Sequence, residues 1–129
     1  MTAFANAFGI HADALAARAR RAELLATNLA NADTPGYRAR DIDFGAVFDA
    51  AQQSSGALAT TDARHIGGGD GEFAYAVRYR EPRQASLDQN TVDVQAERAA
   101  FLDNAMRYQA SVTFMNARIK GLLGALRGE

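Results

Sequence analysis

The hydrophobic pattern at the N-terminal end of the chain predicts one long helix. From about Ala3 to Ala30 the only Gly or Pro is Gly9, and Ala, Leu, Arg and Glu, all good helix formers, dominate. Apolar residues recur in alternating steps of three and four, which is the spacing of a heptad seam. The seam consists of Ala5, Phe8, Ala12, Leu15, Ala19, Ala22, Ala26 and Leu29. The opposite face suits solvent or a polar neighbour, because it carries Asp13, Arg20, Arg21 and Glu23.

The C-terminal end repeats the pattern and predicts a second long helix, from about Asp93 to Arg127. Its seam consists of Phe101, Ala105, Tyr108, Val112, Met115, Ile119, Leu122 and Leu126. Acidic residues lie near its start and basic residues near its end, a distribution that complements the helix dipole. Gly121 and Gly124 each cost about 1 kcal/mol relative to Ala in a helix interior, so we expect the last turns to fray or to need a partner.

The chain between these helices begins with a tight turn, Thr34-Pro35-Gly36-Tyr37. Proline fixes φ at the second position of such a turn, and glycine accepts the positive φ of the third. The first helix must therefore end just before Thr34.

The rest of the middle segment alternates short elements with loop-like sequence. We predict a short helix over 44–53, a Ser- and Gly-rich loop over 54–71, a strand over 73–79 and a polar, extended stretch over 83–91. The strand prediction rests on a period of two, with Phe73, Tyr75, Val77 and Tyr79 on one face, and Pro82 ends it.

These elements describe a mainly α fold of two long terminal helices, packed as a hairpin or with neighbouring subunits, around a small irregular and β-containing middle. The organisation we expect is residues 1–33 as an N-terminal helix, 34–90 as the middle segment and 91–129 as a C-terminal helix. Alanine supplies 29 of the 129 residues and buries little apolar area per residue. A two-helix hairpin with so small a core is marginal, so the two seams favour packing against other chains.

Composition and charge exclude several classes of protein. The formal net charge is -1, and no basic cluster is larger than the one from Arg18 to Arg21, so we predict no nucleic-acid partner. No run of about 18 apolar residues exists to span a membrane, and no cleavable signal peptide is recognisable. The absence of Cys excludes disulfide and thiolate chemistry.

The chain offers little material for catalysis or metal binding. His11 and His65 are far apart and lack the spacing of a metal site. Asp41 and Asp43 are predicted to be a solvated pair beside a turn rather than an acid and base pair. Gly67–Gly69 lacks the Lys-Ser/Thr of a phosphate loop. We therefore predict no catalytic residues, no cofactor, no metal and no small-molecule substrate.

The segment Asn28–Phe44 resembles the signature of the bacterial flagellar axial proteins, which build the rod and hook. It reads Asn-Leu-Ala-Asn-Ala-Asp-Thr-Pro-Gly-Tyr-Arg-Ala-Arg-Asp-Ile-Asp-Phe. The motif positions are Asn28, Asn31, Thr34, Pro35, Gly36 and Tyr37. The continuation Ala39–Phe44 and the C-terminal segments Asn90–Val94 and Ala105–Ser111 resemble the proximal rod members of that family. Physically, Asn28 and Asn31 suit the helix end and Thr34 suits the turn that sends Tyr37 back against a helix.

The resemblance implies a structural subunit of the proximal flagellar rod, with its terminal helices in the inner layer of a tubular assembly. It implies as partners other copies of the chain, the rod protein FlgC, the distal rod proteins, the rod adaptor FliE, and the membrane ring and export gate. It also implies type III export and a place in the periplasmic rod of the basal body, with Phe4 and Phe8 as a candidate export signal. The residues expected at the subunit interface are Phe8, Leu15, Ala22, Leu29, Phe101, Tyr108, Val112, Met115, Ile119 and Leu122.

Two alternatives remain open from the sequence. The chain is another flagellar axial protein, such as FlgC, or it is a cytoplasmic adaptor that uses the two seams as a coiled coil.

Overall fold

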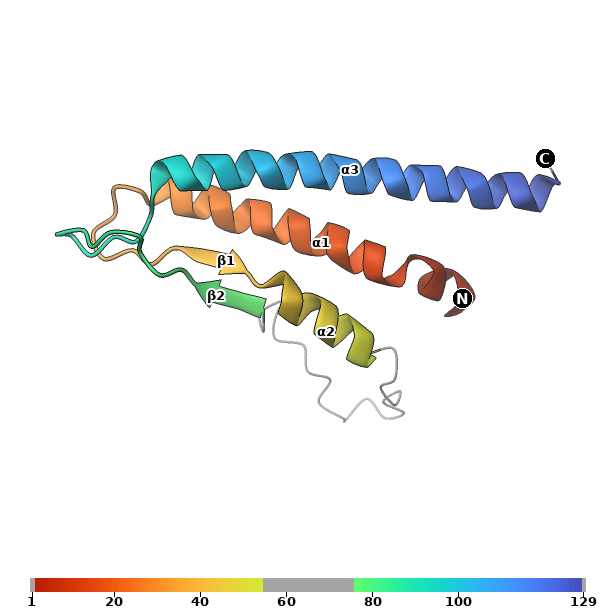
Figure 1. Cartoon of the computed structure of the whole chain (residues 1–129), viewed down its shortest axis with the longest axis horizontal. Helices are drawn as coiled ribbons and strands as arrows, with labels where there is room; N and C mark the ends of the chain where they lie inside the picture. Colours follow the sequence, from red (N-terminus) through yellow and green to blue (C-terminus); the bar gives the residue numbers. More distant parts are fainter. Residues whose placement is uncertain (1, 55–75, 129) are drawn as a thin grey trace.

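The computed structural model describes residues 2–54 and 76–128, with side chains placed for 11–52 and 76–128. The element order is α1 (Thr2–Ala30), β1 (Arg40–Ile42), α2 (Phe44–Ser54), β2 (Val77–Tyr79) and α3 (Val94–Arg127). The two long helices run antiparallel, so that both chain termini lie at one end of an elongated molecule (Figure 1). The strands and α2 lie along the side of α1 away from α3 (Figure 1). The predicted mainly α fold with a small β-containing middle is confirmed.

The ends of α3 are fixed by its capping residues. The carboxylate of Asp93 accepts hydrogen bonds from the backbone N–H groups of Gln95 and Ala96, which would otherwise lack partners at the first turn. At the other end Gly128 adopts a left-handed conformation with φ of 74°, as helix C-caps commonly do. The helix continues through Gly121 without interruption.

The middle segment contains one strand that the sequence pattern did not reveal. β1 pairs antiparallel with β2, placing Arg40 opposite Tyr79 and Ile42 opposite Val77. Three residues are too few for a recognisable alternation, so this strand exists only because β2 pairs with it. α2 confirms the predicted short helix, and Asp43 begins it by accepting a hydrogen bond from the Ala46 N–H.

The remaining predictions for the middle segment agree with the structure in part or lie partly outside the described residues. The described part of the predicted strand 73–79 includes β2, whereas Phe73 and Tyr75 lie outside the described residues. Of the predicted loop over 54–71, only Ser54 is described, and it ends α2 instead of beginning a loop. The stretch 83–91 is not uniformly extended, because the Gln89 N–H donates to Ser86 O across a turn and Gln89 has a φ of 60°.

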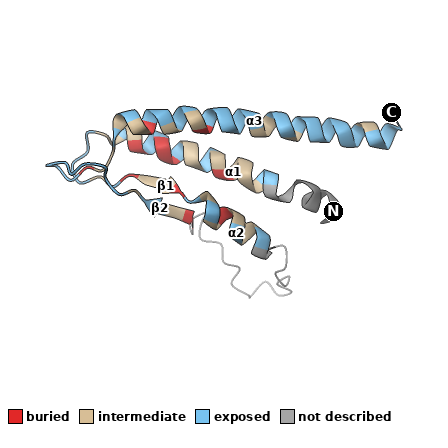
Figure 2. Ribbon diagram, in the orientation of Figure 1, coloured by how far each residue is buried: buried red, intermediate tan, exposed pale blue. Residues whose placement is uncertain are grey.

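The hydrophobic core lies between α1 and the strand–α2 layer, not between the two long helices (Figure 2). It consists of Ala17, Leu24, Ile42, Val47 and Ala76, with Ala16, Phe44, Ala46 and Val77 packed around it. The buried residues of α3 are both polar, Glu97 and Asn104. The large apolar side chains of α3 remain exposed along most of its length (Figure 2). Among the described helices, none has a stretch that is long and apolar enough for a membrane span.

Candidate functional site

The motif residue Asn28 is the centre of a buried hydrogen-bond network at the end of α1. Its side chain is 0% exposed. The amide Nδ2 donates to Arg40 O at 2.8 Å and to Glu97 Oε2 at 3.1 Å, and Oδ1 accepts from the Arg40 N–H at 3.1 Å and from the Tyr37 hydroxyl at 3.2 Å. Because an amide has two donors and an acceptor oxygen, one side chain joins α1 to β1 and to α3.

The predicted turn after α1 is confirmed in its details. The Tyr37 N–H donates to Thr34 O at 3.3 Å, and Gly36 has a φ of 72°, which a residue with a Cβ rarely adopts. The Thr34 hydroxyl donates to Asn31 Oδ1, and Asn31 Nδ2 donates to Thr27 O at 2.8 Å. Thr27 O also accepts the backbone N–H of Asn31 at 3.2 Å, so Asn31 closes the end of α1 with both its backbone and its side chain.

The turn is held from outside by the segment that leads into α3. Asn90 is buried, and its Nδ2 lies within hydrogen-bond distance of the carbonyl oxygens of Asn31, Ala32 and Thr34, at 3.0, 2.8 and 2.9 Å. The Thr91 N–H donates to Tyr37 O at 3.0 Å, and the Thr91 hydroxyl accepts from the Ala39 N–H at 2.8 Å. Two segments more than 50 residues apart therefore form one unit, which we call the motif clamp: Asn28–Ala39 with Asn90–Thr91.

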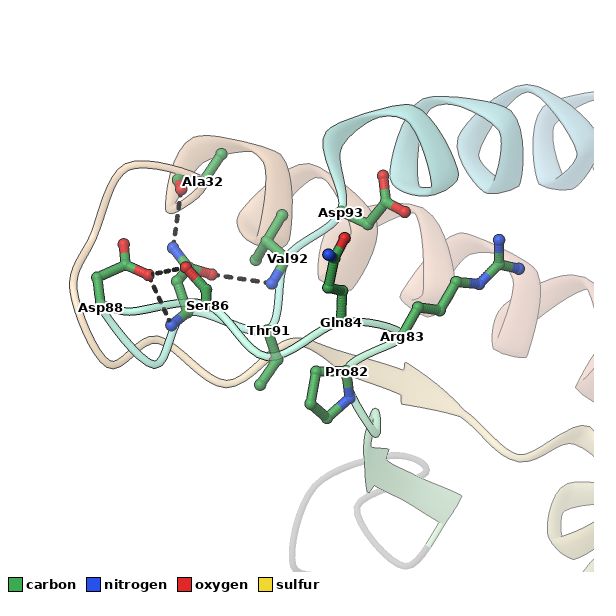
Figure 3. Close-up of a pocket in the computed structure, with 10 residues that line it drawn as sticks. Ala32, Pro82, Arg83, Gln84, Ser86, Asp88, Thr91, Val92 and Asp93 are labelled. Carbon is green, nitrogen blue, oxygen red and sulfur yellow. Dashed lines mark hydrogen bonds between the residues drawn. The ribbon is translucent and has the colours of Figure 1, made fainter.

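A polar pocket of about 730 Å³ lies beside the motif clamp (Figure 3). Its lining is mostly the loop that leads into α3, including Pro82, Arg83 and Asp88 (Figure 3). Hydrogen bonds from the Ser86 hydroxyl and the Asn90 N–H hold the pKa of Asp88 below its usual range. These bonds stabilise the loop.

An ion-pair network connects the motif clamp to the strands. Asp41 accepts from Arg21 Nε at 2.8 Å and from Arg21 Nη2 at 3.0 Å, and it also accepts from Arg80. Arg80 pairs in turn with Glu97, which is 1% exposed. The network thus joins α1, β1, the residue after β2, and α3.

Asp41 and Asp43 do not form the solvated pair that the sequence predicted. Burial is the largest influence on Asp41 and disfavours its charge, but hydrogen bonds from Arg21, Arg80 and the Ile42 N–H together outweigh it and lower the pKa. Asp43 is exposed and begins α2. The prediction was wrong for Asp41 because the two arginines that neutralise it come from elements far away in the sequence.

The sequence predicted no metal or phosphate site at His11, His65 or Gly67–Gly69, and of these residues the structure describes His11 alone. Within 11–52 and 76–128, no three His, Cys, Asp or Glu side chains gather so that they could hold a metal ion. His11 is exposed on α1. His65 and Gly67–Gly69 lie outside the described residues.

Each described residue of the predicted subunit interface is either half-buried or exposed, and none is fully buried. On α1, Leu15, Ala22 and Leu29 are half-buried, and the side chain of Phe8, like that of Phe4, is outside the described set. On α3, Val112 and Met115 are half-buried, whereas the four others, Phe101, Tyr108, Ile119 and Leu122, are each between 37% and 40% exposed. The sequence missed the buried polar residues of this region, Asn90, Glu97 and Asn104, because polar positions do not contribute to a hydrophobic pattern.

Comparison with known proteins identifies the family of the chain that contains the motif clamp. The model of a protein family described as "Flagella basal body rod protein" matches residues 5–38, which include all of the motif from Asn28 to Tyr37. The flagellar basal body rod protein FlgB of Aeromonas hydrophila is 50% identical over 128 residues, covering 98% of this chain and 96% of that protein. FlgB of Cereibacter sphaeroides is 46% identical over the full length of both chains, and FlgB of Escherichia coli is 44% identical over 122 residues, 89% of this chain and 88% of the relative.

The chain belongs to the FlgB family of flagellar basal body rod proteins. The identity extends through the middle segment, which the motif alone does not cover, so the family is specified more narrowly than rod and hook proteins in general. The resemblance noted in the sequence is confirmed, and the alternatives of FlgC and of a cytoplasmic adaptor are not favoured. In this chain the motif residues end α1, reverse the chain and attach both to the segment that leads into α3 and to its first turns.

Proposed function

We propose that this FlgB-family chain polymerises through its two terminal helices as a structural subunit of the proximal rod. In this role it forms part of the shaft that connects the membrane ring and export apparatus to the distal rod, and it performs no catalysis. The observation that carries the proposal is the burial pattern of α3, whose buried residues are Glu97 and Asn104 while its large apolar side chains face outward. Exposed apolar surface of this extent is typical of an interaction site.

The rigidity that a shaft needs is supported by the motif clamp and the ion-pair network. Together they connect α1, β1, β2 and α3 by directional hydrogen bonds rather than by apolar contact alone. Such bonds fix the relative orientation of the elements they join. Torque would then pass between subunits through packed helices whose internal geometry is already determined.

Membership of the FlgB family supports a proposal for the partners and for the route of assembly. We propose contacts with other copies of the chain, with FlgC, with the distal rod proteins, with the adaptor FliE, and with the membrane ring and export gate. We place the chain in the periplasmic part of the rod, reached by type III export, and assign Phe4 and Phe8 to the export signal. The division into 1–33, 34–90 and 91–129 separates assembly helices from the middle segment.

The experiment compares two aspartate substitutions on α3 in a strain that lacks its own copy of the protein. Tyr108→Asp places a charge on the predicted interface and should leave export intact while blocking rod assembly and swimming. Ala110→Asp is the matched control, because Ala110 is exposed on α3 but is neither one of its large apolar residues nor part of the predicted seam. Normal motility with Tyr108→Asp would contradict the proposal.

A further inference from the structure

The two seams meet along a groove on one flank of the molecule. The groove has a volume of about 450 Å³ and lies between α1 and α3. The small side chains of Ala19, Ala22 and Ala105 and the rings of Phe101 and Tyr108 line it, and all five are seam positions. The seams therefore converge on a common groove instead of forming the buried core. Two helices with this arrangement leave room for the ridge of a third.

Two polar atoms beside this groove lack the partners that buried polar atoms normally have. Among the described residues, Asn104 Oδ1 and Arg18 Nε are buried and accept or donate no hydrogen bond. Asn104 is 1% exposed, and both residues contribute to the groove lining. Asn104 Nδ2 already donates to Arg18 O at 2.9 Å, so the amide is held in place with its acceptor unused. Unpaired buried groups are rare and costly, so an occupant that supplied both a donor and an acceptor would be favoured here once Arg18, whose guanidinium lies 5.3 Å from the centre of the Phe44 ring, had shifted.

One exposed stripe of α3 combines a hydrogen-bond donor and acceptor with large apolar side chains. Asn116, Ile119, Leu123 and Leu126 follow one another on α3 in steps of three, four and three, and all are exposed. This spacing places them on one face of a helix, as an amide followed by three large apolar side chains. An amide supplies both a donor and an acceptor, and the apolar side chains suit a groove lined with alanines.

We propose that this groove receives the stripe Asn116–Leu126 of α3 from a second copy of the chain, an inference that rests on the proposed function. The half-buried Arg18 side chain shifts, the Asn116 amide pairs with Asn104 Oδ1 and Arg18 Nε, and Ile119 and Leu123 occupy the apolar part of the groove. An apolar helix face seated in a groove is an established mode of recognition, and one polar pair within such a seam fixes its register. Since the groove and the stripe are different surfaces, the contact is heterologous and can propagate along a filament.

Because the sequence contains no cysteine, a direct test by cross-linking is possible. Purified Ala105→Cys and Ile119→Cys variants are mixed and treated with a short bismaleimide linker. We expect severalfold more cross-linked dimer than from the control mixture of Met106→Cys with Ile119→Cys, because Met106 adjoins Ala105 in sequence but lies outside the groove. Equal yields from the two mixtures would overturn the inference.

A second substitution tests the groove without altering the stripe. Ala22→Phe, introduced into the Ala105→Cys variant, fills the groove and should lower its cross-linking to Ile119→Cys severalfold. Ala99→Phe, at an exposed position of α3 outside the groove, should leave the yield unchanged. Circular dichroism establishes that each variant keeps its helix content, and loss of the cross-link with both substitutions would count against the groove as the binding site.

The same cysteine variants in cells separate this inference from the proposed function. If both support swimming and are recovered in purified basal bodies, the proposed function holds. A cross-link between Ala105→Cys and Ile119→Cys subunits in those basal bodies then supports the groove contact. A cross-link from Ala105→Cys only to a different protein overturns the second copy as occupant. Absence of the chain from basal bodies would instead overturn the proposed function itself.

Discussion

Asn28 in α1 donates a hydrogen bond to Glu97 in α3 at 3.1 Å, and both side chains are buried. This bond connects the first residue of the family motif to the C-terminal helix across 69 residues of sequence. It explains how a turn motif near one end of the chain takes part in joining both terminal helices. The same Asn28 side chain also holds the backbone of Arg40, so the position of β1 depends on it as well.

Replacing Asn28 should therefore be more damaging than replacing its neighbour in the motif. Asn28→Ala leaves buried groups of Arg40 and Glu97 without a partner, and each such group costs about 1–3 kcal/mol. Asn31→Ala is the control, because that half-buried side chain bonds only to Thr27 and Thr34 nearby. Urea unfolding followed by circular dichroism should show the larger loss of stability for Asn28→Ala. Equal losses would contradict the role of Asn28 as the connecting residue.

The motif clamp should require the hydrogen-bonding amide group of Asn90, and not only a side chain of the same size. Asn90→Asp keeps nearly the same side-chain shape. It replaces the Nδ2 group, which donates to the carbonyl oxygens of Asn31, Ala32 and Thr34, by a carboxylate oxygen that cannot donate when ionised. We expect a loss of about 2–3 kcal/mol at neutral pH, because buried acceptors lose their donor and face a charge. Unfolding measured in parallel at acidic pH should show a smaller loss, since a protonated carboxyl can donate. A variant as stable as the wild type at neutral pH would contradict this interpretation.

Two glycines should respond oppositely to substitution by alanine. Gly36→Ala forces a Cβ into a backbone with φ of 72° and should destabilise the fold by about 1–2 kcal/mol. Gly121→Ala should stabilise α3 by up to about 1 kcal/mol, because a Cβ at that helical position meets nothing within 4 Å. Thermal unfolding of the two variants beside the wild type tests both signs. A gain of stability in Gly36→Ala would show that the turn does not need its left-handed glycine.

The ion pairs of Asp41 should make stability depend on acidic pH. The folded-state pKa of Asp41 is lowered, so the folded chain holds this carboxylate ionised at pH values where the unfolded chain begins to bind a proton. The contribution is therefore fully present above the unfolded value of about 4 and is lost as pH falls through the folded value. The difference in unfolding free energy between wild type and Asp41→Asn should shrink below about pH 4.

Denaturant unfolding across the acidic range measures that difference. Asp49→Asn, an exposed position on α2, serves as the control and should leave the unfolding free energy nearly unchanged at neutral pH. A destabilisation by Asp41→Asn that stays constant down to about pH 2 would contradict the assignment. The effect of the substitution would then not depend on the ionisation of the Asp41 carboxyl group.

Local signals in the sequence were sufficient for the elements that depend on nearby residues. The two terminal helices, the short helix α2, and the turn at Pro35 and Gly36 all appear where the pattern predicts them. Helix propensity, capping and turn geometry act over a few residues, so one sequence contains the information. The family motif could be recognised for the same reason. Its ten residues are contiguous, so the sequence alone indicates a flagellar rod protein.

The tertiary structure alone decided which faces of those helices are buried. The sequence shows a seam on α1 through Leu15, Ala22 and Leu29, yet the buried apolar residues within 11–30 of that helix are Ala17, Leu24 and Leu25. α1 has to cover β1 and α2 as well as contact α3, and a heptad pattern does not reveal that second neighbour. Likewise Asp41 becomes half-buried only because Arg21 and Arg80, brought from 20 and 39 residues away, neutralise it. The sequence determined the helices and the family, and long-range contacts between polar groups determined how the helices are joined and which apolar surface is left for other chains.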